Sequence, residues 1–391
     1  MRITHATRIL IVIISIFSLV GCQKEDIPPV SSNERTIFMY LPWSTNLTEY
    51  FYNNISDMEK AISRRGLHNE RVIVFLSTSA SEAEMFEIVY ENGHCRRDML
   101  KEYTTPAFTT ETGLTAILND MKSYAPAANY AMIIGCHGMG WLPVEQSRGR
   151  AITDFVYHWE YTDVPQTRFF GGLTAEYQTD VTTLSQSLSS SGLKMDYILF
   201  DDCYMSSLEA AYDLRHVTDY LIACPTEIMV YGMPYSTMGE YLLAEKPDYS
   251  AICNAFYQFY SSYQYPYGTI AVTDCSQLDE LADLMKLIHS SYSLDNSQIT
   301  YIQRMDGYSP VIFYDFGDYV RTLCGNDSEL YGYFIALMEK VIPYKAHTER
   351  FYTASRGPIT VEQYSGITTS EPSSNSRTID YPQTSWYLAT H

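Results

Sequence analysis

Short apolar runs alternate along this chain with longer stretches in which apolar residues recur every three or four positions. The runs predict buried strands, and the longer stretches predict amphipathic helices. We expect strands at 35–41, 71–76, 130–136, 195–201, 219–224 and 268–273, and a hairpin at 85–103 around an Asn-Gly turn. We expect helices at 47–65, 113–123, 180–193, 205–215, 236–244, 249–263, 277–292, 311–324 and 328–344.

The repeated order of strand and helix defines the expected fold class. Short connections between such elements are typical of an α/β protein with a mostly parallel sheet that helices cover on both faces. We place this α/β domain at residues 34–295, followed by a C-terminal extension at 296–391 that packs on it. The Ser/Thr/Pro-rich stretch 367–385 reads as a surface excursion.

Composition and charge narrow the class of protein. The chain has 391 residues, and 46% of them are hydrophobic, which excludes a disordered or low-complexity chain. A formal net charge of −20 argues against nucleic acid as a partner, because phosphate binding needs clustered Lys and Arg. The same charge suits an exported protein and would attract cationic peptides or Ca²⁺.

Residues 1–22 read as a targeting segment with a basic start and an apolar stretch too short to span a bilayer. It ends in Leu-Val-Gly-Cys22, which resembles a bacterial lipobox and implies a lipid anchor on the Cys22 sulfur. The alternative is an ordinary cleaved signal with a chance cysteine. Residues 23–33 then form a polar tether whose acidic stretch is similar to export signals of surface lipoproteins, so we expect an outer-membrane lipoprotein of the cell envelope.

Two of the predicted strands end in residues that carry chemistry. The strand at 195–201 leads into Asp201-Asp202-Cys203, and the strand at 130–136 leads into His137-Gly138. Because carboxyl ends of parallel strands meet at one sheet edge, a base and a nucleophile could meet there. A helix expected directly after Cys203 would favour the thiolate through its N-terminal N–H groups and dipole. Cys/His spacing typical of a structural zinc site is absent from the sequence, so we assign no metal ligands.

Neighbouring residues supply the rest of a peptidase site. The N–H groups of Gly138 and Cys203 would form an oxyanion hole. Strand alternation puts Asp201 on the same face as Cys203, where its carboxylate would favour a cationic substrate side chain. It puts Asp202 on the opposite face as a helix-capping or structural acid. The alternative interpretation is that His137 is a hydrogen-bonded structural residue and Cys203 a core residue.

At these residues the chain resembles a known family. His137-Gly138-Met139-Gly140-Trp141 looks like the H-G-x-G-W motif of the clostripain-like cysteine peptidases, relatives of caspases, gingipains and legumain. Asp201-x-Cys203-x-Met205, continued by a glutamate, a tyrosine and Leu-Arg, resembles the D-x-C-x-M-x-x-x-E-x-x-Y-x-L-R block of that family. The resemblance implies a caspase-like three-layer sandwich and a His137/Cys203 dyad without a required third member.

The resemblance also implies cleavage after Arg or Lys, with Asp201 at the floor of the pocket. A second pocket acid of some members falls near Tyr231, and Glu227 is the candidate replacement. Some members need Ca²⁺ and cut themselves between the two strands. Arg148 and Arg150 lie in the segment after His137, which is either such a processing loop or a solvated charged loop.

We therefore expect an exported, membrane-anchored cysteine endopeptidase that acts on polypeptides. Its chemistry needs no cofactor, although Ca²⁺ could bind. The rival hypothesis is a surface lipoprotein that keeps the fold, has lost catalysis and binds peptides or glycans.

Overall fold

The structure is a computed structural model that describes residues 33–144, 177–326 and 328–391. From Ser32 onward the chain forms one compact unit. Within the described ranges, no helix is both long enough and apolar enough to cross a membrane. The expected targeting segment at 1–22, almost all of the tether and the segment that contains Arg148 and Arg150 lie outside the described residues.

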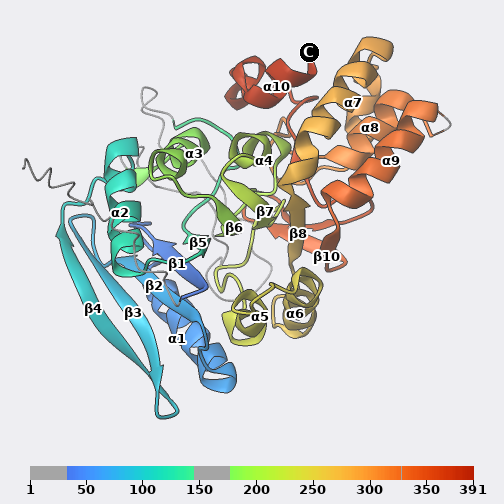
Figure 1. The fold of residues 1–391 in the computed structure, drawn as a ribbon. Coiled ribbons are helices and arrows are strands. Elements are labelled where there is room, and N and C mark those ends of the chain that lie inside the picture. The colour runs from blue at the N-terminus through green and yellow to red at the C-terminus, as the bar shows by residue number, and fades with distance from the viewer. Residues whose placement is uncertain (1–32, 145–176, 327) are drawn as a thin grey trace, which may run out of the picture. The chain divides into compact units, whose positions relative to one another are not determined.

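A nine-stranded sheet runs through this unit in the order β10-β8-β7-β6-β5-β1-β2-β3-β4 (Figure 1). Its strands are β1 (Arg35–Leu41), β2 (Glu70–Ser77), β3 (Glu82–Glu91), β4 (His94–Thr104), β5 (Asn129–Gly135), β6 (Met195–Asp201), β7 (Thr218–Ala223), β8 (Thr269–Asp274) and β10 (Tyr344–His347). The central strands β2, β1, β5, β6 and β7 are parallel, and antiparallel strands flank them on both sides. This confirms the predicted α/β fold with a mostly parallel central sheet.

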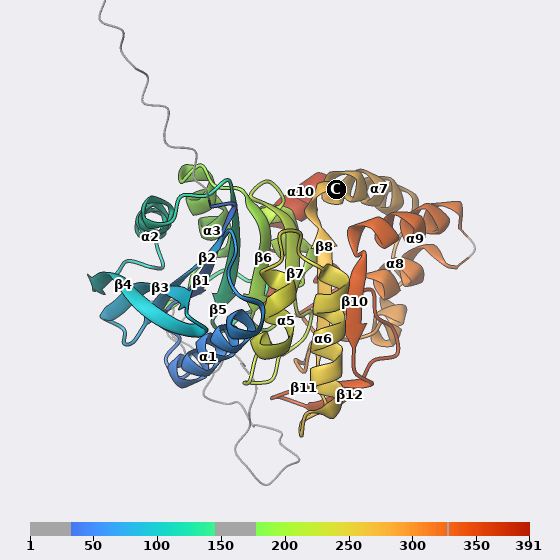
Figure 2. The same ribbon diagram turned by 60° about the horizontal axis from the view of Figure 1, so that its bottom comes forward.

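Helices cover both faces of the sheet, as Figures 1 and 2 show. One face carries α1 (Thr48–Arg65), α5 (Tyr235–Leu242) and α6 (Tyr249–Ser262), and the other carries α2 (Glu111–Tyr124), α3 (Val181–Ser190) and α4 (Leu208–Leu214). The central strands are buried on both faces; β1, for example, has no exposed residue along its whole length. That double burial explains why these strands read as continuous apolar runs.

The C-terminal part continues the same unit. It contains α7 (Leu278–Ser291), β9 (Tyr314–Asp315), α8 (Phe316–Cys324), α9 (Glu329–Val341), β11 (Arg350–Thr353), β12 (Gly357–Thr360), β13 (Thr368–Thr369) and α10 (Ser385–Thr390). Strand β10 pairs with β8, so this part of the chain supplies an edge strand of the main sheet.

Two predictions for the C-terminal part are wrong. The helix expected from 311 begins only at Phe316, because residues 314–315 pair with β13. The stretch predicted as a surface excursion is buried where it starts, with Ile367, Thr368 and Thr369 fully enclosed. Its hydroxyl and N–H groups are satisfied by internal partners, including the backbone of Ser206, so its polar composition does not require solvent.

Candidate active site

The candidate dyad lies just beyond the ends of two neighbouring parallel strands. Strands β5 and β6 pair directly, and Gly135 lies opposite Asp201 at the end of the ladder. His137 and Cys203 each follow two residues after that pair, so the register delivers them to the same level at one sheet edge. Both residues are buried, with 8% of His137 and none of Cys203 exposed.

Gly138 lies against the backbone of Cys203. A Cβ atom on Gly138 would sit 2.3 Å from the carbonyl oxygen of Cys203 and 3.1 Å from its nitrogen. Atoms do not approach so closely, so only glycine allows the segment after His137 to pack against the cysteine turn. The two strand-end segments are therefore in direct contact.

Asp202 ties the two segments together. Its carboxylate accepts hydrogen bonds from the Cys136 backbone N–H, at 2.6 Å, and from the Cys136 thiol, at 3.3 Å. Asp202 is only 1% exposed. Of the two roles expected for Asp202, helix cap or structural acid, these contacts support the structural one, since Ser207 caps α4.

Asn46, which sequence reasoning missed, contacts the candidate base. His137 Nε2 lies 2.8 Å from Asn46 Oδ1, and because that oxygen can only accept, Nε2 carries the proton. In this tautomer the Nδ1 atom of neutral His137 carries no proton. Asn46 follows β1, which pairs with β5 on the side opposite β6. A polar residue after this apolar run was the sequence signal that could have identified Asn46 as part of the site.

The environment of the Cys203 thiol differs from the expectation. The predicted helix does not start beside Cys203, because α4 begins at Leu208 after a cap by Ser207. The helix dipole is therefore too remote to favour the thiolate in this form. Burial, together with the Glu227 carboxylate, raises the pKa of Cys203 well above its usual value. Its Sγ accepts a hydrogen bond from the Ile228 N–H at 3.4 Å.

The residue after Cys203 anchors this turn to the C-terminal part. Tyr204 has φ +61°, an unusual conformation for a residue with a side chain. Its ring stacks on Phe313 at a centroid distance of 5.0 Å, and its hydroxyl donates to Glu227 at 2.8 Å. The Glu227 carboxylate also accepts from the Ala354 N–H. Both Glu227 oxygens are thus held by the protein, which makes Glu227 a support of the Cys203 turn.

Asp201 is buried and held in a fixed position. Its two oxygens accept from the Met233 N–H, at 2.9 Å, and from the Tyr235 hydroxyl, at 3.1 Å. Ionised carboxylates have further lone pairs for additional donors. Tyr231, two residues before Met233, donates its hydroxyl to Asp57 on α1 at 2.5 Å, so a carboxylate from another element lies next to the Tyr231 position.

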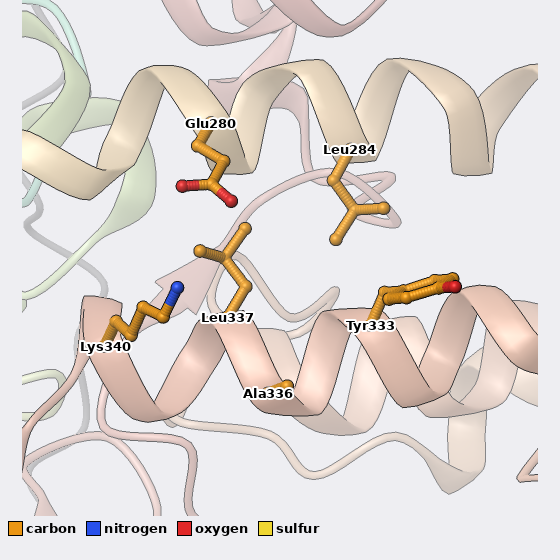
Figure 3. A pocket seen from close by; sticks show the side chains of 6 residues that line it. All are labelled: Glu280, Leu284, Tyr333, Ala336, Leu337 and Lys340. Carbon is orange, nitrogen blue, oxygen red and sulfur yellow. The ribbon is translucent and has the colours of Figure 1, made fainter.

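One pocket of the described residues lies away from these strand ends. Figure 3 shows it between α7 and α9, lined by Glu280, Leu284, Tyr333, Ala336, Leu337 and Lys340. None of its lining residues belongs to β5, β6 or the segments that follow them.

Histidine and cysteine at adjacent parallel-strand ends, with a glycine packed on the cysteine backbone, define the site arrangement of an α/β cysteine peptidase. Residues 39–348 match the model of the clostripain family, peptidase family C11. The chain belongs to this family, and it is a cysteine peptidase of that class. No curated protein matches the sequence significantly.

Solved structures of related proteases share the fold. A secreted C11 cysteine protease from Bacteroides thetaiotaomicron, called iotapain, is 52% identical over 92% of this chain and 99% of its own, with a TM-score of 0.84. A clostripain from the same species, in complex with the peptide inhibitor BTN-VLTK-AOMK, is 53% identical over 57% of this chain and 99% of its own (TM-score 0.55). An inactive zymogen C11 protease from Parabacteroides distasonis is 26% identical over 93% of this chain and 99% of its own (TM-score 0.75).

Proposed function

We propose that this chain is an exported, membrane-anchored cysteine endopeptidase that cleaves polypeptides after Arg or Lys, with Cys203 as nucleophile and His137 as base. The observation that carries the proposal is the register of β5 and β6, which brings both residues to one sheet edge. The contact between Gly138 and the Cys203 backbone supports it, because binding alone would not require that approach.

The chemistry needs only the residues of this chain. His137 Nδ1 takes the Cys203 proton, and the thiolate attacks the carbonyl carbon of the scissile bond. The N–H groups of Gly138 and Cys203 stabilise the oxyanion. The His137 imidazolium then gives its proton to the leaving amine as the C–N bond breaks. Water, deprotonated by His137, hydrolyses the thioester, releases the acid and restores the thiol.

Asp201 is the proposed determinant of basic specificity. Its carboxylate is buried two residues before Cys203, and two donors of the protein fix its position. A buried carboxylate pairs well with the guanidinium or ammonium group of a substrate. In the inhibitor bound to the related clostripain, the last peptide residue before the AOMK group is lysine. We assign Glu227 and Tyr231 to the support of this region, since their polar groups already bind Tyr204, Ala354 and Asp57.

We further propose that the described form is a closed precursor. The enclosed Cys203 thiol has a raised pKa, which keeps it protonated at neutral pH. Self-cleavage after Arg148 or Arg150 is the proposed activating step. Lipidation at Cys22 would hold the enzyme in the outer membrane of the cell envelope.

Covalent labelling of the full-length protein tests the peptidase assignment. A lysine-directed acyloxymethyl ketone should label wild type and Cys95→Ala, in which a thiol on β4 away from the site is removed, but not Cys203→Ala. Labelling that persists in Cys203→Ala defeats the assignment. A folded wild-type protein that neither labels nor cleaves peptides, even after an added protease has cut it at Arg148 or Arg150, supports the rival, a binding lipoprotein.

Processing and anchoring are tested separately. We expect two fragments from wild type on a denaturing gel and one band from Cys203→Ala and from Arg148→Ala/Arg150→Ala. One band from all three proteins rejects self-cleavage at this loop. Metabolic labelling with a fatty acid should mark wild type and not Cys22→Ser, and equal labelling of both would reject the anchor.

A further inference from the structure

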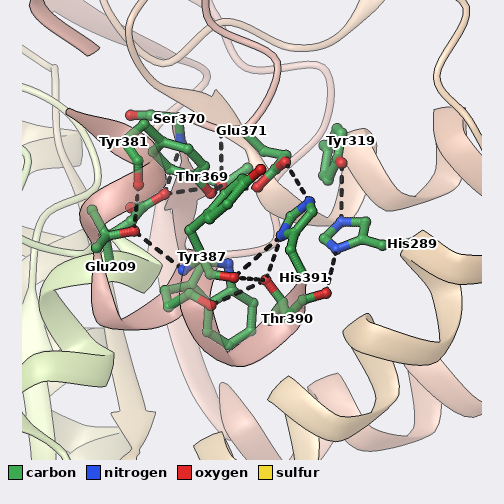
Figure 4. Close-up of polar contacts among 12 residues, drawn as sticks. Glu209, His289, Tyr319, Thr369, Ser370, Glu371, Tyr381, Tyr387, Thr390 and His391 are labelled. Atoms are coloured by element: carbon green, nitrogen blue, oxygen red, sulfur yellow. Dashed lines mark hydrogen bonds and ion pairs between the residues drawn. The ribbon is translucent and has the colours of Figure 1, made fainter. Parts of the chain in front are cut away.

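Two histidines and a glutamate from distant parts of the sequence meet near the C-terminal helix. His289 lies on α7, Glu371 follows β13, and His391 is the C-cap residue of α10 (Figure 4). One potential ligand atom of each lies within 4.8 Å of the other two. The dyad shares no residue with this group, which has no role in the proposed peptide cleavage.

Hydrogen bonds fix which nitrogen of His289 is a donor. Its Nδ1 lies 3.2 Å from the Thr390 carbonyl oxygen, which can only accept, so Nδ1 carries the proton. Its Nε2 therefore holds a lone pair, and the Tyr319 hydroxyl lies 3.2 Å from it. A backbone carbonyl that orients the far side of an imidazole is the usual support of a metal-binding histidine.

Neighbouring groups also hold His391 and Glu371. His391 Nδ1 lies 3.1 Å from the Thr390 hydroxyl oxygen and 3.3 Å from the Tyr387 carbonyl oxygen, and His391 Nε2 lies 3.2 Å from Glu371 Oε1. In neutral His391 protonated on Nδ1, the Nε2 lone pair would face a carboxylate, which a cation between them would relieve. The second Glu371 oxygen accepts from the Tyr381 hydroxyl at 2.6 Å, which fixes the carboxylate.

We propose that His289, Glu371 and His391 bind a Zn²⁺ ion that fastens the C-terminal helix to α7. Two imidazoles and one carboxylate are ligands that zinc prefers, whereas Ca²⁺ takes oxygen ligands almost exclusively. Tetrahedral zinc holds its ligand atoms about 3.5 Å apart. The three ligand atoms lie within 4.8 Å of one another, so side-chain movements of roughly 1 Å bring them to zinc-binding distances. The Tyr319 hydroxyl or a water takes the fourth position.

The site connects to the region behind the nucleophile. The residues just before Glu371 hold Glu209 of α4: the Ser370 N–H and the Thr369 hydroxyl both donate to it, at 2.9 and 3.0 Å. Glu209 follows Cys203 by six residues along the chain. Helix α4, which follows the Cys203 turn, packs against this segment. A metal bound to Glu371 therefore stabilises the segment that holds α4.

Calorimetric titration of ZnCl₂ into metal-stripped full-length protein tests the proposal. The Cys203→Ala background keeps the chain in one piece and removes the active-site thiol as a competing ligand. We expect one tight equivalent, weakened at least about tenfold by Glu371→Gln, His289→Ala or His391→Ala, and weakened about ten- to a hundredfold by the supporting change Tyr381→Phe. His94→Ala, on an exposed residue of β4, should bind like the parent.

Two further measurements distinguish loss of a zinc ligand from misfolding of a variant. Zn²⁺ should raise the melting temperature of the parent but not of Glu371→Gln, and Co²⁺ should give the visible spectrum of a tetrahedral N/O site only when all three ligands are present. Ca²⁺ should not displace either ion. Absence of a tight equivalent, or equal zinc affinity in the parent and in both Glu371→Gln and His391→Ala, overturns the site. The group would then be a histidine–glutamate ion pair alone.

Discussion

The Asp202 carboxylate accepts hydrogen bonds from the backbone N–H and the thiol of Cys136, so the residue before Cys203 is bonded to the residue before His137. These two contacts cross from β6 to β5 at the point where both strands end. They act on the dyad without touching it, because Asp202 directly precedes Cys203 and Cys136 directly precedes His137. The distance between the proposed nucleophile and the proposed base therefore depends on a side chain outside this pair.

Replacing Asp202 should separate the two dyad segments. In Asp202→Ala the half-buried Cys136 N–H loses its hydrogen bond to a carboxylate, which costs about 1–3 kcal/mol in the free energy of unfolding. We expect kcat to fall more than KM rises, since positioning of the dyad is lost and substrate contacts are kept. Asp202→Asn keeps one acceptor oxygen and should fall between wild type and Asp202→Ala. Urea unfolding and peptide kinetics measure both effects, and an Ala variant with wild-type kcat would contradict this role.

Asn46 should set the tautomer of His137. In Asn46→Ala, Nε2 loses its acceptor, so the proton can move to Nδ1 and remove the base. We expect kcat/KM to fall by about ten- to a hundredfold, part of the general contribution of acid–base catalysis. Asn46→Asp keeps an acceptor and adds a negative charge, which raises the pKa of His137.

The pH profile separates this role from a structural one. Asn46→Asp should restore much of the activity and move the acidic limb of the kcat/KM profile to higher pH. If Asn46→Ala and Asn46→Asp lose the same activity and the acidic limbs of their pH profiles stay at the wild-type position, Asn46 acts through packing. It then does not control the proton on His137.

The sequence predicted the elements that position the dyad better than it predicted the state of the dyad. Strand ends and motifs located Cys203 and His137, because double burial makes parallel strands continuous apolar runs that stop sharply. The burial of the thiol was not predictable, since it depends on Ile228, Glu227 and the packing of the turn. Those contacts join residues far apart in the chain and leave no local pattern.

The C-terminal part was predicted less well for a related reason. Residues 367–370 are Ile, Thr, Thr and Ser, a composition common in exposed loops. Here the polar groups find partners on Ser206 and Glu209, which belong to the turn and helix after Cys203. Polar content predicts solvent exposure only where the fold offers no such partners.

Gly138→Ala should lower kcat by about 10²–10³ while the protein stays folded. The added Cβ would lie 2.3 Å from the Cys203 carbonyl oxygen, so the segment must move and its N–H leaves the oxyanion position. Loss of one oxyanion donor costs about 10²–10³ in kcat. Gly332→Ala on α9 is the matched control, because a Cβ there meets nothing within 4 Å and alanine favours a helix. Peptide kinetics beside a melting curve distinguishes the two changes, and an active Gly138→Ala enzyme would contradict the proposed oxyanion hole.

Glu209 should make the stability of the protein depend on pH. Burial raises its pKa from 4.5 to about 7, although hydrogen bonds from the Ser370 N–H and the Thr369 hydroxyl to one carboxylate oxygen act in the opposite direction. The other oxygen, Oε2, is buried without a hydrogen-bond partner. A pKa raised on folding means that the folded state holds the proton more tightly, so this contribution to stability is complete below about pH 4.5 and is lost as the pH rises through about 7. The difference corresponds to roughly 3 kcal/mol.

Glu209→Gln keeps the acceptor oxygen and cannot ionise, so it should be close to wild type in stability at pH 5 and more stable than wild type at pH 8. Urea unfolding of both proteins at several pH values gives the difference in their free energies of unfolding. In this difference the titration of all other groups cancels. Glu102→Gln, on the exposed face of β4, controls for the loss of one negative charge and should show no such crossover. The prediction would be wrong if the difference in the free energy of unfolding between wild type and Glu209→Gln were the same at pH 5 and pH 8. The buried carboxyl would then ionise without cost, although α4 and β13 enclose it.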